Sequence, residues 1–118
     1  MSLDQEYQSS LLLAICAYRN KDYFDIDKMY DIFGAIILES NKSQRLPQQS
    51  IHPNFLTGRY NELDELLSEG FNNRYICANP DYTRIEFNLE VEHAIMMINK
   101  RPDVKNYKNL AQIFWTNI

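Results

Sequence analysis

The side chains that most often carry chemistry are few in this 118-residue chain, and their spacing keeps them apart. His52 and His93 are the only histidines, and neither has a second histidine or a Cys-x-x-Cys pair at the spacing of a zinc site. Glu90, Glu92 and His93 are close in sequence, but adjacent positions on a helix point in different directions. The sequence therefore predicts no metal site.

Cysteine chemistry is the other route to catalysis that the composition allows. Cys16 and Cys77 are the only cysteines, and both stand in apolar runs. A nucleophilic cysteine needs a nearby base and an electropositive setting, and only Cys77 has a candidate cation, Arg84, which we expect opposite it in a hairpin. The three glycines are too widely spread for a phosphate-binding loop. We therefore expect a non-enzymatic protein without a cofactor, and keep an enzyme using Cys77 or His52 as an alternative.

Composition predicts one globular domain over residues 1–118. Hydrophobic residues make up 45% of the chain and aromatic residues 13%, which is enough for a real core. The 16 acidic and 12 basic residues give a net charge of −4, which disfavours a polyanionic partner. The N-terminal residues lack the basic region of a secretory signal, and no apolar run approaches the ~20 residues of a membrane span. We expect a cytoplasmic protein with reduced thiols and no membrane partner.

Two helices and a long loop are predicted in the N-terminal half. Ser2 with Gln5 forms a capping-box pattern for a helix that reaches Asn20. Residues 11–18 of this helix are apolar nearly all round, which predicts that it is central to the fold. Asp25 is expected to cap a second helix that ends at residues 40–42. Residues 42–56 then form the longest irregular stretch. In the second helix, the polar residues that mark the side expected to face water are Asp27, Lys28, Asp31 and Glu39.

The segment 59–87 predicts a helix followed by a two-stranded hairpin. Gly70 stands where a glycine ends a helix in left-handed geometry, and Pro80 favours a type I turn at 79–82. With Asn79 opposite Tyr82, the hairpin would pair Ile76 with Ile85 and Cys77 with Arg84. The common inner face of that hairpin would consist of Ile76, Ala78, Ile85 and Phe87.

Two further helices follow, capped by Asn88 and Asp103. With the earlier elements they predict an α+β, mostly helical, winged-helix-like fold with about five helices and one β-hairpin in the C-terminal half.

A winged helix raises the possibility of DNA reading through the helix that precedes the hairpin. The cations available for nucleic-acid contact are Arg59, Arg74 and Arg84. Carboxylates repel phosphate, so the acidic outward face of that helix disfavours this function. A winged-helix DNA-binding transcriptional regulator is therefore the alternative to protein docking. The outward face is expected to carry Glu62, Asp64, Glu65, Ser68 and Glu69.

The last helix carries an apolar stripe that is large for the last helix of a small domain. The stripe closes the core under one interpretation and docks a partner or a second copy under the other, because Trp and Tyr often anchor interfaces. Docking predicts that Trp115→Ala abolishes association with little loss of folding. Basic residues nearby form a solvated face or meet an acidic partner: Lys100, Arg101, Lys105 and Lys108. The predicted partner-binding residues are Tyr107, Leu110, Phe114, Trp115 and Ile118.

Four short motifs occur in an order that resembles a known family. They are residues 25–31 (DIDKMYD), 50–53 (SIHP), 66–71 (LLSEGF), and Tyr107 with Leu110, Ala111 and Trp115. Together they are similar to the middle component of bacterial ABC-type three-component conflict systems, in which Arg59 would be the arginine that follows the His-Pro loop. The resemblance implies an adaptor that links an SMC/Rad50-like ATPase to an effector in defence against phages and other mobile DNA. It implies no catalytic residue.

Overall fold

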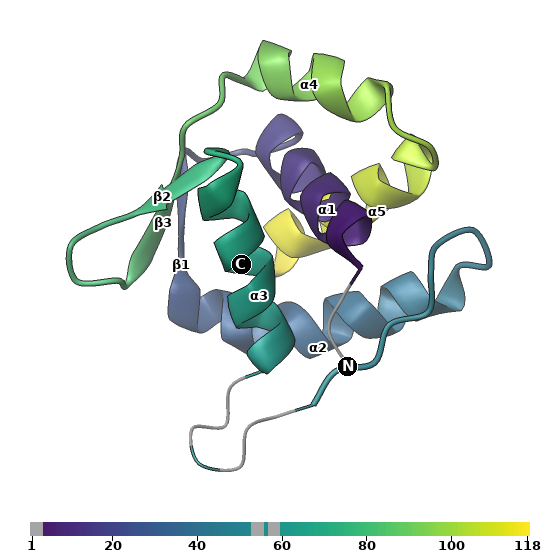
Figure 1. The fold of residues 1–118 in the computed structure, drawn as a ribbon, viewed down its shortest axis with the longest axis horizontal. Coiled ribbons are helices and arrows are strands. Elements are labelled where there is room, and N and C mark those ends of the chain that lie inside the picture. The colour runs from purple at the N-terminus through teal and green to yellow at the C-terminus, as the bar shows by residue number, and fades with distance from the viewer. Residues whose placement is uncertain (1–3, 53–55, 57–59) are drawn as a thin grey trace.

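The computed structural model describes residues 4–52, 56 and 60–118, and it has the predicted α+β, mostly helical architecture (Figure 1). In chain order the elements are α1 (Gln5–Ala17), β1 (Tyr23–Asp25), α2 (Ile26–Lys42), α3 (Asn61–Asn72), β2 (Ile76–Ala78), β3 (Arg84–Phe87), α4 (Val91–Asn99) and α5 (Val104–Asn117). The strands form one antiparallel sheet in the order β1-β3-β2. This order of helices and strands is consistent with a winged-helix-like arrangement.

Helix α1 is the centre of the fold and packs against α3, α4 and α5. Its residues from Tyr7 to Ala17 are all buried, and for residues 11–17 the apolar run in the sequence predicts this. The cap differs from the prediction, because the Asp4 carboxylate accepts the Tyr7 N–H at 3.0 Å. Ser2 lies outside the described residues, and the helix ends at Ala17 rather than Asn20.

Strand β1 is the element that the sequence did not predict. It has three residues, too few for an alternating pattern, and it pairs with β3 so that Phe24 lies opposite Ile85. The Phe24 ring packs edge-on against Phe114 at 5.1 Å between centroids. Asp25 stands at the N-cap position of α2 but makes no capping hydrogen bond, and its carboxylate lies 3.8 Å from the Lys28 ammonium.

The β2–β3 hairpin has a different register from the predicted one. The Tyr82 N–H does donate to the Asn79 carbonyl at 3.0 Å, as the predicted turn requires. Tyr82 then adopts left-handed geometry (φ 56°), and the Asn79 N–H bonds the Arg84 carbonyl. Ile76 therefore pairs with Phe87, and not with Ile85. The shift is two residues, so the four predicted inner-face residues still share one side of the sheet.

Gly70 does not end its helix, because α3 continues to Asn72. The chain reverses instead at Arg74, which has left-handed geometry (φ 61°). A Cβ on Gly70 would lie 2.7 Å from Ile76 Cδ1 and 2.8 Å from Leu12 Cδ1. Glycine is required there by the close approach of β2 and α1.

The C-terminal helices begin later than predicted or without the predicted caps. Helix α4 begins at Val91 after Glu90, while the Asn88 N–H bonds the Tyr75 carbonyl. Asp103 precedes α5 in left-handed geometry and makes no side-chain cap. Between α2 and α3, the described part of the loop is held by buried Leu46 and by hydrogen bonds that join Asn41 to Gln49.

Candidate functional site

The apolar stripe of α5 lies in the core. Trp115 is only 8% exposed, and its indole N–H donates to the Ile15 carbonyl at 2.9 Å. Ile118 is the one member that stays partly exposed. The prediction that these five residues form a docking surface is therefore corrected, because α5 fills the space beside α1 and α2. The buried members are Tyr107, Leu110, Phe114 and Trp115.

Two tyrosine hydroxyls lie inside this core. The Tyr7 hydroxyl donates to Ser40 Oγ at 2.7 Å, and the ring of Tyr7 lies 5.9 Å from that of Tyr107. Burial raises the pKa of Tyr7 to about 12, and burial together with the neighbouring Tyr7 raises the pKa of Tyr107 to about 12. These groups tie α1, α2 and α5 together, and we assign them a structural role.

A groove between α2 and α5 exposes apolar side chains. Leu38 on α2 is 66% exposed, Ala35 is exposed one turn before it, and Ile113 of α5 is half-buried beside them. The groove has a volume of about 530 Å³. We call it the α2–α5 groove, and its lining residues are Ala35, Leu38, Glu39, Asn41, Lys42 and Ile113.

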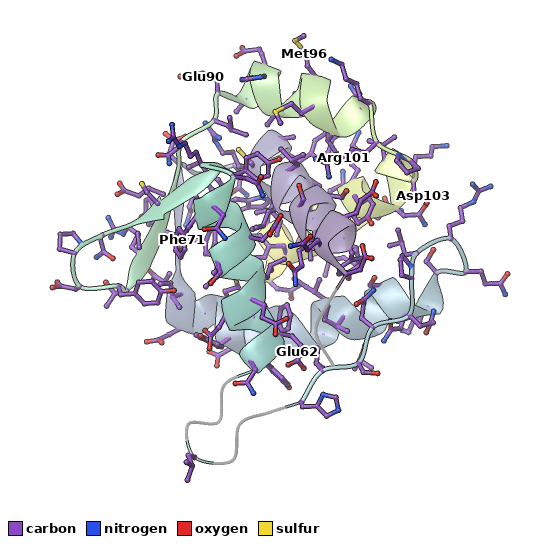
Figure 2. The ribbon with its side chains drawn as sticks, viewed as in Figure 1. Glu62, Phe71, Glu90, Met96, Arg101 and Asp103 are labelled. Atoms are coloured by element: carbon purple, nitrogen blue, oxygen red, sulfur yellow. The ribbon has the colours of Figure 1, made fainter. Side chains whose placement is uncertain are left out.

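A second apolar area lies on α4. Met96 is 61% exposed, and Figure 2 shows it pointing away from the rest of the molecule. Ile95 and Met97 are only partly buried, because α4 packs mainly on α1. Since neighbouring helix positions point in different directions, Ile95 and Met97 lie on the two flanks of α4 and Met96 is the apolar centre of its outward side, which we call the α4 face. It lies across the molecule from α2, with α1 and α5 between them (Figure 1).

The outward face of α3 is acidic, with one exception to the prediction. Asp64, Glu65 and Glu69 line a hollow of about 420 Å³ beside α1. Glu62, however, is only 3% exposed, because it turns toward the preceding loop. Its carboxylate accepts the backbone N–H of His52 and lies 3.5 Å from His52 Nδ1. Glu62 is therefore an anchor for the loop and not part of the surface charge.

Of the three arginines predicted for nucleic-acid contact, the two that the structure describes do not lie together. Arg59 lies outside the described residues. Arg74 is exposed in the turn before β2, whereas Arg84 stands at the other end of the hairpin, opposite Asn79. The Arg84 guanidinium lies 4.2 Å from the centroid of the Tyr23 ring and stacks on β1. The hairpin register therefore keeps Arg74 and Arg84 apart.

The cysteines do not meet the requirements of a nucleophile. Cys16 is buried, and its Sγ accepts a hydrogen bond from Arg19 Nη1 at 3.1 Å. Burial raises the pKa of the Cys16 thiol despite the opposing effect of Arg19. Cys77 lies opposite Glu86 and not opposite Arg84, as a consequence of the corrected register.

The other charged and metal-ligating residues are also dispersed. His93 is exposed, and no three His, Cys, Asp or Glu side chains of the described residues could hold a metal ion together. In the basic cluster, Arg101 is drawn inward and donates to Ser10 Oγ at 3.1 Å (Figure 2). Lys100, Lys105 and Lys108 remain exposed. None of the helices in the described ranges is long and apolar enough to cross a membrane.

Sequence reasoning missed Leu38 and Met96, the two most exposed large apolar residues on helices. The available signal was weak, since each follows directly on residues of a buried stripe: Leu38 follows Ile37, and Met96 follows Ile95. Comparison of the chain with protein-family models, curated proteins and solved structures found no match.

Proposed function

We propose that this chain is a protein-docking adaptor without catalytic activity of its own. The observation that carries the proposal is the pair of exposed apolar areas on opposite sides of the molecule. An adaptor needs two separate surfaces, and the α2–α5 groove and the α4 face are separated by the core helices α1 and α5 (Figure 1).

Each area has the chemistry of a docking surface. Covering an exposed leucine or methionine contributes about 1–2 kcal/mol, and the groove beside Leu38 offers room for a further side chain. Methionine is flexible and adapts to partners of different shape. Charged residues border both areas, with Glu39 and Lys42 beside the groove and Glu92 and Lys100 on α4. An apolar centre with a polar rim is the usual composition of a specific interface.

The resemblance to the middle components of three-component conflict systems supplies the class of partner. It supports an SMC/Rad50-like ATPase and an effector as the proteins that the adaptor links. The acidic face of α3 also favours a protein partner over a nucleic acid, because carboxylates repel phosphate.

The test begins with the neighbouring genes. If they encode an SMC/Rad50-like ATPase, that protein is purified and titrated into this chain by calorimetry. We expect Met96→Asp or Leu38→Asp to weaken binding at least tenfold, because each places a charge in an apolar contact. Gln112→Asp on α5 is the matched control, since this residue is exposed and lies outside the two areas. Binding that is absent, or unchanged in both variants, contradicts the proposal.

The alternative, a winged-helix DNA-binding regulator, is favoured by one observation. The order of helices and strands is consistent with such proteins, and Arg74 is exposed just before the hairpin. We expect fluorescence anisotropy with random duplex at low salt to show no binding at micromolar protein. Tight binding that weakens steeply with salt and is lost in Arg74→Glu would favour the regulator instead.

A further inference from the structure

One face of α2 has a pattern that complements itself. Asp31, Ala35, Leu38 and Lys42 are spaced by four, three and four residues, so they lie on one side of the helix. All four are exposed. They span about 16 Å of helix at 1.5 Å per residue. We call this row the α2 stripe.

Read in opposite directions, two copies of the stripe match at every position. An antiparallel pair that sets Leu38 against Ala35 also sets Lys42 against Asp31, and a two-fold axis repeats both contacts. The leucine fills the space that the small alanine leaves, which allows the helices to approach closely. Each copy thus contributes one acidic, one basic, one large and one small residue.

Two other charged surfaces of the described chain lack this property. The hollow beside α3 carries Asp64, Glu65 and Glu69, so a two-fold contact there would oppose like charges. A two-fold contact at the exposed lysines 100, 105 and 108 would also oppose like charges, in this case positive ones. On α4, a two-fold contact could set Glu92 against Lys100, but it would also set Met96 against Met96, with no small residue to receive the side chain. Charge and size complementarity together therefore point to the α2 stripe as the surface that suits a second copy.

The structure around the stripe can accommodate this contact. The Lys42 ammonium lies 2.8 Å from the Glu39 carboxylate, but both side chains are exposed, and such pairs contribute little. An ammonium group has three donors, so Lys42 can bind Asp31 of a second copy without releasing Glu39. Ile113, at the wall of the α2–α5 groove, extends the apolar contact beyond the stripe.

We infer that the α2–α5 groove binds α2 of a second copy of this chain, as an antiparallel two-fold dimer. This inference rests on the proposed adaptor function, since it names the occupant of one of the two docking areas. The adaptor is then a dimer whose two α4 faces are left for the ATPase and the effector.

Sedimentation equilibrium from micromolar to submillimolar protein tests the dimer. We expect the wild type to dimerise, and Asp31→Lys or Lys42→Asp to weaken the dimer about tenfold or more, because each places like charges at two symmetric contacts. The double variant Asp31→Lys/Lys42→Asp restores complementarity and should dimerise like the wild type. An equal mixture of the two single variants should form a heterodimer. Leu38→Asp should abolish association, and Gln112→Asp is the matched control.

Three results would overturn the inference: a wild type that stays monomeric, a dimer indifferent to Leu38→Asp, or a double variant no better than the single ones. Circular dichroism confirms that each variant is folded. A monomer whose ATPase binding is still lost in Leu38→Asp would refute the dimer and leave the adaptor function standing. A dimer with the expected charge dependence that binds no other protein would support the dimer and refute the adaptor.

Discussion

Helices α2 and α5 pack against each other, yet they use their apolar residues in opposite ways. The sequence favours α5 as the docking helix, because its stripe contains the largest aromatic residues. In the structure Trp115 and Phe114 of α5 are buried, while Leu38 of α2 is 66% exposed on a side expected to be polar. The aromatic stripe of α5 holds the fold together, and the exposed leucine of α2 faces solvent.

The difference shows that the size and composition of an apolar stripe do not tell whether another element of the same chain covers it or whether it stays available to a second protein. Helix α5 has α1 and α2 beside it, and Phe24 of β1 lies against Phe114. Among the described residues that line the groove, Ile113 at the edge of α5 is the only one from outside α2 that lies beside Leu38. Exposure is therefore set by the neighbours that the fold supplies.

The largest expected effect comes from a substitution in the buried apolar stripe of α5. Trp115→Ala should lower the free energy of unfolding by about 3–5 kcal/mol, because it leaves a cavity beside Phe114 and removes a bond to the Ile15 carbonyl. Urea unfolding followed by circular dichroism measures the change. A loss below about 1 kcal/mol would mean that α5 is not part of the core.

A smaller effect is expected from pH, and it sharpens the assignment of Tyr107 to the core. Its pKa is raised from 10.0 to about 12 in the folded state, so the unfolded state loses its proton first as pH rises. The stabilisation that comes from this shift is fully present below pH 10.0 and is lost as pH rises through about 12.

The free energy of unfolding, measured across this alkaline range, should therefore fall less steeply in Tyr107→Phe than in the wild type. Tyr7→Phe should have a similar consequence, because burial raises that pKa to about 12 as well. Equal slopes for the wild type and both variants would show that these hydroxyls are not buried in solution.

The smallest effect is expected on the exposed side. Leu38→Asp should change the free energy of unfolding of the monomer by no more than about 0.5 kcal/mol, since the side chain is mostly in water already. Thermal and urea unfolding at low protein concentration measure this. A loss above about 2 kcal/mol would place Leu38 in the core and remove the contrast between the two helices.

The helices were largely predictable because their signals are local. The apolar run before Tyr18 predicted a buried α1, and the Pro80 turn predicted the hairpin and its inner face. Strand β1 was not predictable, because three residues carry no period and the strand exists only through its pairing with β3. The hairpin register was not predictable either, since it depends on the left-handed geometry of Tyr82 after the turn.

The candidate site was less predictable than the fold. The acidic character of α3 follows from composition, but the removal of Glu62 from that surface depends on a contact with His52 in the preceding loop. Gly70 has the sequence context of a helix end, while its structural reason is the contact with Leu12 and Ile76. Each of these outcomes depends on how one element packs against another, which the local sequence pattern does not give.

By itself, the sequence determined a mostly helical α+β domain with an acidic balance, because helix spacing, turn residues and net charge are properties of neighbouring residues or of the whole composition. Only the tertiary structure decided that α5 closes the core and that Leu38 and Met96 stay exposed. The physical reason is that burial requires a second element on the same face. Which element arrives there depends on long-range packing around α1.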